Sequence, residues 1–166
     1  MGQRNKWWAV GSTLLVCVWM CVVFAFSAQP DTESSQVSEH VSYELVSGVN
    51  EIFQLGQSQM QMESTALKIE FPVRKAAHMT EYAILAVLLF FMFSAYGIGQ
   101  KDKNPIFKRC LYALLVSALY AATDEFHQLF VAGRAGRVTD VLIDSTGAFI
   151  ALLMVGFIIK KKSNKK

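Results

Sequence analysis

Apolar residues along the chain are gathered into four long runs that are separated by shorter polar stretches. The runs cover residues 7–28, 79–99, 109–130 and 138–159. Each run is about as long as the roughly 20 residues that a helix needs to cross the hydrocarbon core of a membrane. We therefore expect a single all-α membrane domain, residues 1–166, built as a bundle of four transmembrane helices.

The polar stretches between the runs indicate where helices start and how they are connected. The last two runs are joined by only a few residues, which predicts a tight antiparallel hairpin. Asn104 followed by Pro105 is typical of an N-cap and a first-turn proline, so the third helix should begin inside the preceding basic loop.

Composition agrees with a membrane protein, because 53% of the residues are hydrophobic and 17% are charged. A cleaved signal peptide is an alternative for the first run, since Ala25 and Ser27 fit a small-residue cleavage site. The uncharged run is longer than a usual signal core, which favours a retained anchor. The odd number of cysteines, all within or beside the runs, argues against a disulfide framework.

Lysine and arginine are unevenly divided between the two sides of the expected bundle, and short loops rich in them stay in the cytoplasm. The richer side holds Arg4, Lys6, Lys101, Lys103, Lys108, Arg109, Lys160, Lys161, Lys162, Lys165 and Lys166. The poorer side holds Lys68, Arg74, Lys75, Arg134 and Arg137. Both termini are therefore expected in the cytoplasm. Topology and anionic lipid headgroups account for the basic loop and tail, so we do not infer nucleic-acid binding.

Residues 29–74 should then form an extracellular segment between the first two membrane helices. Its first part, "QPDTESSQ", is typical of a flexible linker. Val41, Leu45, Val49 and Ile52 follow at the spacing of an amphipathic helix, and a weaker amphipathic patch at residues 60–69 leads to Pro72. The segment is too short for a core of its own, so we expect it to lie on the membrane surface or on the mouth of the bundle.

Unusual charges gather where the expected helices reach the outer side. Helical rise places Asp144 ~24 Å above the inner boundary, which is inside a membrane core of roughly 30 Å. A buried, unpaired carboxylate at Asp124 or Asp144 would cost at least a few kcal/mol, so we expect the arginines and His78 to serve as their partners. The pattern predicts a polar pocket in the outer leaflet, formed by the second, third and fourth runs.

Other roles for these side chains remain open at the level of sequence. Single charges near helix ends, such as Lys75, Glu125, His127 and Arg134, are as often structural ion pairs or snorkelling groups. His78, Glu81, Asp124 and Asp144 contain metal-binding residue types, but no tight ligand spacing occurs, so we expect neither a metal nor a cofactor. A transporter is disfavoured because four helices without an internal repeat or broken helices make a poor monomeric transporter.

The blocks "RKAAHMTEY" and "DEFHQLFVAGRAGRVTDVLIDSTGA" resemble the VanZ family of small bacterial membrane proteins. The resemblance implies a protein of the bacterial cell membrane that gives resistance to teicoplanin and related lipoglycopeptides. Two features depart from the family pattern: the loop "VAGRAGR" has no proline before its first Gly-Arg, and residues 29–71 are longer than in a minimal member. The family's motif falls on Lys75, His78, Glu81, Tyr82, Asp124, Glu125, Gln128, Arg134, Asp140, Asp144 and Gly147.

Two mechanisms fit this chemistry. The protein could bind or occlude the antibiotic, or the lipid-linked cell-wall precursor that the antibiotic targets, with Arg134 or Arg137 gripping a carboxylate or phosphate. Alternatively, it is an intramembrane enzyme on a lipid-linked substrate, with Glu81 and Asp124 as base candidates and His78 as their proton partner. The absence of a nucleophile motif favours binding, and oligomerisation stays possible. The predicted ligand-binding residues are Lys75, His78, Glu81, Tyr82, Asp124, Glu125, Gln128, Arg134, Arg137, Asp140 and Asp144.

Overall fold

The computed structural model of the protein describes residues 3–163, with side chains from Lys6 onward. No strand occurs in this range, which confirms the all-α class. The side chain of Arg4, and Lys165 and Lys166, on which the orientation prediction partly rests, lie outside the described residues. The helices are α1 (Gln3–Ser27), α2 (Asp31–Phe53), α3 (Gln59–Ala95), α4 (Pro105–Gln128) and α5 (Val138–Ser163).

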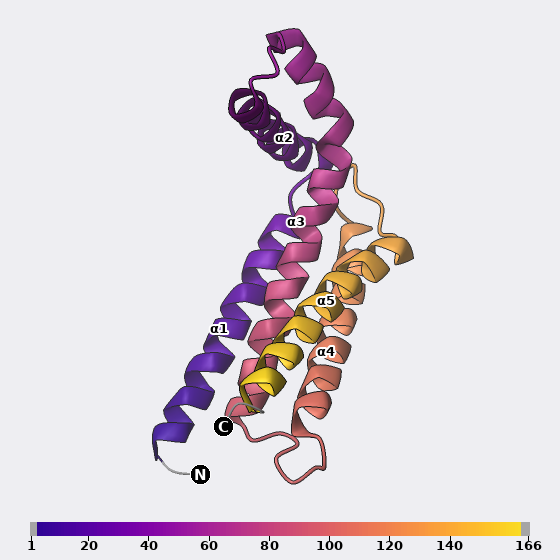
Figure 1. Ribbon diagram of the computed structural model, residues 1–166. Coiled ribbons are helices and arrows are strands. Elements are labelled where there is room, and N and C mark those ends of the chain that lie inside the picture. Colours follow the sequence, from indigo (N-terminus) through magenta and orange to yellow (C-terminus); the bar gives the residue numbers. More distant parts are fainter. Residues whose placement is uncertain (1–2, 164–166) are drawn as a thin grey trace.

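Four of these helices, α1, α3, α4 and α5, are long and apolar enough to cross a membrane, as the sequence predicts. They run side by side as a bundle, and the described chain ends lie together at one end of it (Figure 1). Helix α2 lies at the opposite end (Figure 1). Helix α4 begins at Pro105, and the Asn104 side chain accepts a hydrogen bond from the Phe107 amide, which confirms the predicted cap.

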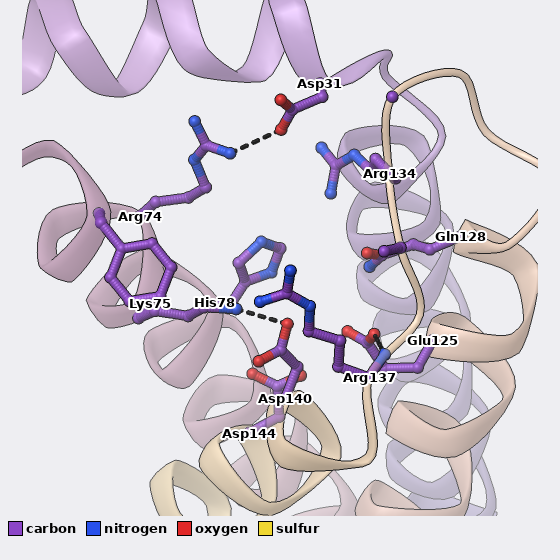
Figure 2. A pocket seen from close by; sticks show the side chains of 13 residues that line it. Asp31, Arg74, Lys75, His78, Glu125, Gln128, Arg134, Arg137, Asp140 and Asp144 are labelled. Carbon is purple, nitrogen blue, oxygen red and sulfur yellow. Dashed lines mark hydrogen bonds and ion pairs between the residues drawn. The ribbon is translucent and has the colours of Figure 1, made fainter.

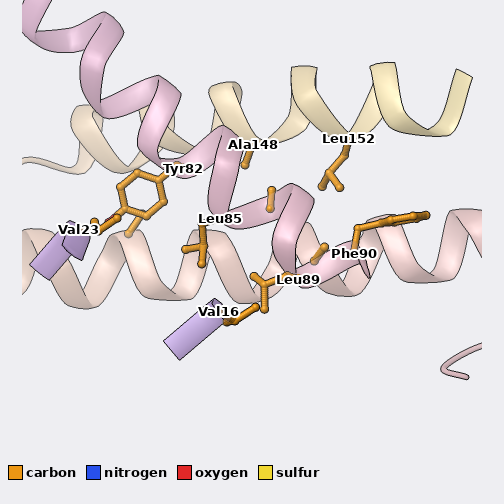
Figure 3. Close-up of a cluster of buried hydrophobic side chains, with 11 residues drawn as sticks. Val16, Val23, Tyr82, Leu85, Leu89, Phe90, Ala148 and Leu152 are labelled. Atoms are coloured by element: carbon orange, nitrogen blue, oxygen red, sulfur yellow. The ribbon is translucent and has the colours of Figure 1, made fainter. Parts of the chain in front are cut away.

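Helix α3 is the centre of the bundle, because it packs against α1, α2, α4 and α5. Its buried side chains recur every three to four residues and face small residues of the neighbouring helices, such as Ala148 of α5 (Figure 3). Small residues allow helices in a membrane to approach closely. The fully or almost fully buried side chains of α3 in this core are Tyr82, Leu85, Ala86, Leu89 and Phe90.

The closest approach between α3 and α5 occurs at Gly147. A Cβ atom added there would lie 2.3 Å from the carbonyl oxygen of Met79, a distance at which the backbones would have to separate. This contact lies one turn from Asp144, on the face of α5 that also carries Asp140. Gly147 therefore sets the distance between the polar ends of α3 and α5.

The expected flexible linker at the start of residues 29–74 is wrong, because α2 already begins at Asp31. Two acidic residues, Asp31 and Glu33, lie in its first turn, where they interact favourably with the positive end of the helix dipole. The Asp31 amide also donates to the carbonyl of Ala132 in the α4–α5 loop at 3.2 Å. This tertiary contact fixes the start of a helix whose first turns have the composition of a linker.

The second predicted span is also different from the observed helix, since α3 continues unbroken through Pro72 and includes the amphipathic patch at residues 60–69. Its 37 residues correspond to a length of ~55 Å, well beyond a hydrocarbon core of roughly 30 Å. The N-terminal half of α3 therefore projects past the bundle, where it packs against α2. There, Ser38 of α2 donates a hydrogen bond to Glu70, two residues before Pro72.

Replacing Ser58 with alanine should fray the first turn of α3. The Ser58 hydroxyl accepts from the Gln61 amide and the Gln61 side chain accepts from the Ser58 amide, so a complete capping box starts the helix. Loss of such a cap costs about 1 kcal/mol. Amide exchange at Gln61 and Met62, whose amides donate to Ser58, should accelerate in Ser58→Ala and stay unchanged in the exposed control Ser64→Ala; equal rates in both variants would contradict the role of the cap.

Candidate functional site

A cavity of about 200 Å³, which we call the polar pocket, lies at the end of the bundle where α2 begins. Side chains from α3, the last turn of α4, the α4–α5 loop and the first turns of α5 surround it, together with the first residue of α2 (Figure 2). Its lining residues are Asp31, Phe71, Arg74, Lys75, His78, Glu125, Gln128, Gly133, Arg134, Ala135, Arg137, Asp140 and Asp144.

Arg74 lies on the α2 side of the polar pocket, and most of its hydrogen-bond donors are bound by side chains of the protein. Its guanidinium pairs with Asp31 at 2.7 Å and with Glu70 one turn earlier on α3, and it donates to Ser35 at 2.5 Å. With most of its donors engaged, Arg74 fastens α2 to α3. Neither Arg74 nor Asp31 is among the sequence-predicted ligand residues.

Lys75 joins α3 to α5 across the pocket. Its ammonium lies 2.5 Å from the carboxylate of Asp140, and both side chains are mostly buried. The same ammonium lies 5.4 Å from the ring centre of Phe71, within the range of a cation–π interaction. The close α3–α5 contact at Gly147 brings these partners within reach, so the pair of Lys75 and Asp140 depends on the packing below it.

His78 and Glu81 lie one turn apart on α3, and only His78 reaches the polar pocket. Nδ1 of His78 lies 3.4 Å from Oε2 of Glu81, and His78 lines the polar pocket whereas Glu81 does not. Glu81 instead lines a neighbouring cavity between α1, α2 and α3. Trp19 of α1 donates to the backbone carbonyl of Glu81 at 3.0 Å, which holds α1 against this turn.

Asp124 and Tyr82 are buried beneath the polar pocket and do not line it. Asp124 is 3% exposed and Tyr82 is fully buried. Gln128 donates to Oδ2 of Asp124 at 3.3 Å and to the hydroxyl of Ser27 at 3.1 Å. Within the described residues, Oδ1 of Asp124 and the Tyr82 hydroxyl have no hydrogen-bond partner. The expected pairing of Asp124 with an arginine or His78 is therefore wrong: its partner is an amide one turn away.

Arg134 and Arg137 come from the α4–α5 loop and have different surroundings. Arg134 donates to the carbonyls of Gln29 at 2.8 Å and Phe26 at 3.4 Å, so it ties the loop to the end of α1. Burial lowers the pKa of the Arg134 guanidinium from its ordinary value, and the charge of Asp31 opposes this shift. An arginine remains charged under such conditions. Arg134 is therefore a fixed cation at the mouth of the pocket.

Arg137 is the exposed cation of the polar pocket. Its backbone amide donates to Glu125 at 2.8 Å, while its guanidinium makes no ion pair or hydrogen bond within the described part of the chain and points into the cavity (Figure 2). Gly136 makes this loop path possible, because a Cβ there would lie 2.1 Å from the Glu125 carbonyl oxygen. The guanidinium of Arg137 is thus positioned, charged and available to a ligand.

The structure brings together eight of the eleven predicted ligand residues around the polar pocket: Lys75, His78, Glu125, Gln128, Arg134, Arg137, Asp140 and Asp144. The other three, Glu81, Tyr82 and Asp124, lie behind or below it. Asp144 is 3% exposed and forms no ion pair with an arginine or with His78 among the described residues, so its expected partner is also absent. The helical spacing of Arg74 and His78 is a signal that could have added Arg74 to the site.

The part of the polar pocket beside Arg137 favours an anion. Two of its cations, Arg74 and Lys75, are neutralised by ion pairs with Asp31 and Asp140, whereas Arg137 retains a guanidinium without such a partner. A guanidinium presents paired donors that match a carboxylate or phosphate. Among residues 3–163, no group of three or more histidine, cysteine, aspartate or glutamate side chains is arranged to hold a metal ion.

Comparisons with known proteins give the family of the chain. The family model described as VanZ/LLP1 matches residues 12–159, which is most of the chain and includes every residue of the polar pocket. The comparisons with curated proteins and with solved structures give no match. The resemblance found in the sequence is thereby confirmed, and the chain belongs to the VanZ/LLP1 family.

Proposed function

We propose that this VanZ/LLP1 family member gives resistance to lipoglycopeptide antibiotics such as teicoplanin by binding a lipid-linked cell-wall precursor at the outer leaflet. The polar pocket holds an anionic group of the precursor, a phosphate or a peptide carboxylate, and thereby reduces its capture by the antibiotic. The observation that carries the proposal is the free guanidinium of Arg137 in a pocket where Arg74 and Lys75 are paired with Asp31 and Asp140.

The size of the polar pocket supports the precursor over the antibiotic as the group inside it. Its volume is about 200 Å³, below the roughly 300–1,000 Å³ of sites that enclose drug-sized ligands. A phosphate or a terminal carboxylate is small enough for such a space, while the body of a lipoglycopeptide is not. If the antibiotic is also engaged, it contacts the rim of the pocket or the surface of α2.

The surroundings of the acidic residues support binding over catalysis. A general acid or base has to come within hydrogen-bond reach of the reacting group. Glu81 and Asp124, the base candidates from the sequence, do not line the polar pocket, and Asp124 is engaged by Gln128. His78, Glu125 and Asp144 do line it, so an intramembrane enzyme stays the alternative that the experiment below has to exclude.

Replacing Arg137 with alanine should remove resistance while leaving the protein folded and inserted. Its guanidinium makes no contact that holds the fold, and loss of a charge-assisted bidentate contact weakens anion binding by about tenfold or more. Wild type, Arg137→Ala and the control Lys68→Ala, which removes an exposed cation of α3 outside the pocket, are expressed in a susceptible Gram-positive host. Minimal inhibitory concentrations of teicoplanin and vancomycin are then measured.

Mass spectrometry of the extracted antibiotic and cell-wall precursors separates the two mechanisms. Under the proposal, wild type and Lys68→Ala raise the teicoplanin concentration needed for inhibition, Arg137→Ala does not, and every precursor and antibiotic is chemically unchanged. A modified precursor or antibiotic that depends on the wild-type protein would show an enzyme instead. Equal resistance in wild type and Arg137→Ala would remove the polar pocket from the function.

A further inference from the structure

A second cavity of about 210 Å³ lies directly beside the polar pocket, in the corner between the end of α1, the first half of α2 and α3. Most of the surface that its walls expose is apolar, in contrast to the polar pocket, and polar residues such as Ser34, Ser38 and Glu81 complete the lining. We call it the apolar cavity. Its hydrophobic lining residues are Phe26, Val37, Val41, Val73 and Ala77.

Three side chains form a common wall between the two cavities, since Arg74, His78 and Arg134 line both. The three nitrogen-bearing side chains thus stand at the boundary between a polar and an apolar space. A ligand that extends from one cavity to the other passes its polar part over these groups. Arg134 is held there by the carbonyls of Gln29 and Phe26, so this boundary is built into the fold.

The residues of the apolar cavity are not needed to fill the core of the bundle. Val37 and Val41 project from α2 and are 60% and 42% exposed, and Phe26 at the end of α1 is 49% exposed. An apolar cavity of about 150 Å³ already binds a molecule of the size of benzene. A space of about 210 Å³ with such walls therefore accepts several methylene groups of a hydrocarbon chain.

We propose that the two cavities form one site for an amphiphile, in which a phosphate or carboxylate lies in the polar pocket and the first part of its hydrocarbon chain lies in the apolar cavity. This inference rests on the proposed anion-binding function and adds the class of ligand, which is a lipid with one anionic headgroup attached to a hydrocarbon chain. The junction between the anionic group and the chain lies at the wall of Arg74, His78 and Arg134, and the chain covers the exposed valines of α2. Helix α2 is then part of the ligand site.

The test compares anions with and without a chain on the full protein in phosphatidylcholine nanodiscs. The probes are inorganic phosphate and decyl phosphate, and acetate and decanoate, and calorimetric titrations are corrected with empty nanodiscs. Decyl phosphate or decanoate should bind wild type at least about tenfold more tightly than its chainless counterpart, because each buried methylene adds to the affinity. The pair with the larger gain identifies the headgroup as phosphate or carboxylate.

A substitution that fills the apolar cavity tests the place of the chain. Val41→Trp should lower the affinity for the chain-bearing probe about tenfold and leave the affinity for the chainless anion unchanged. The matched control is Val49→Trp, which adds the same side chain two turns further along α2, where Val49 lines a separate apolar groove. Equal chain dependence in wild type and Val41→Trp would overturn the proposal while leaving anion binding intact.

A measurement on the wild type alone covers the case in which Val41→Trp fails to fold. Decyl phosphate with a photoreactive diazirine in its chain should crosslink to residues of the apolar cavity, such as Phe26, Val41 or Val73. Crosslinks confined to the other lipid-facing surfaces of the bundle would overturn the proposal. If neither chainless anion nor chain-bearing probe binds the wild type, the proposed function fails first and the amphiphile site fails with it.

Discussion

Replacing Gly147 with alanine should force α5 away from α3 and lower the stability of the bundle by about 2 kcal/mol, or a melting temperature by about 5 °C. The new Cβ would lie 2.3 Å from the Met79 carbonyl oxygen, and a backbone atom cannot move aside as a flexible side chain can. Separation of the helices also pulls apart Lys75 and Asp140, which are 2.5 Å apart. Thermal unfolding of the purified protein in detergent measures the effect.

Gly156→Ala is the matched control for this change, because it lies on the same helix. A Cβ at Gly156 would meet its nearest neighbours, Ile106 and Cys110, at 3.9 and 4.0 Å, which are ordinary contacts. Alanine is also the better helix former by about 1 kcal/mol. Gly156→Ala should thus be as stable as wild type or more so, and a Gly147→Ala protein that matches it would contradict the tight α3–α5 contact.

Replacing Arg74 with alanine should release α2 from α3. The guanidinium binds Asp31, Glu70 and Ser35, and its loss leaves two carboxylates without their cation. Because the groups are partly exposed, we expect a cost of about 2–3 kcal/mol, below the 3–5 kcal/mol of a fully buried pair. Amide exchange in α2 should accelerate by about tenfold or more, while the cores of α4 and α5 stay protected.

Lys68→Ala serves as the control for Arg74→Ala, since it removes an exposed cation from the same half of α3. It should leave amide exchange in α2 unchanged. Asp31 and Arg74 line the polar pocket, and their ion pair also holds the start of α2 against α3. Arg74→Ala should therefore also reduce resistance. A variant in which α2 stays as protected as in wild type would show that the apolar contacts of α2 hold it without the ion pairs.

The four membrane helices could be predicted because their signal is local: each needs an apolar run of sufficient length, and each has one. The start of α4 could also be predicted, because Asn104 and Pro105 act within the first turn of the helix. Pro72 misled the prediction because proline usually ends a helix, and the packing of α2 against α3, which keeps the helix continuous, is not visible in the sequence.

Most residues of the candidate site could be predicted from the sequence, whereas the partner that each residue binds could not. Helical spacing and topology bring eight predicted residues to one end of the bundle, because faces of neighbouring helices repeat every three to four residues. The partners were missed at Asp124, which bonds to Gln128, and at Asp31, which meets Arg74 from forty-odd residues away. Such choices depend on distances of a few ångströms between helices, and spacing along one helix does not contain them.

The sequence by itself determined that this chain is an all-α membrane bundle of the VanZ/LLP1 family with its unusual charges at one end, because apolar run length and residue order along a helix are local properties. Only the tertiary structure decided which charged side chains form ion pairs within the protein and which remain free to bind a ligand. Packing at Gly147 pairs Lys75 with Asp140, the contact of α2 with α3 engages Arg74, and the loop leaves Arg137 open. These differences arise because ion pairing falls off within a few ångströms, and those distances exist only once the helices are packed.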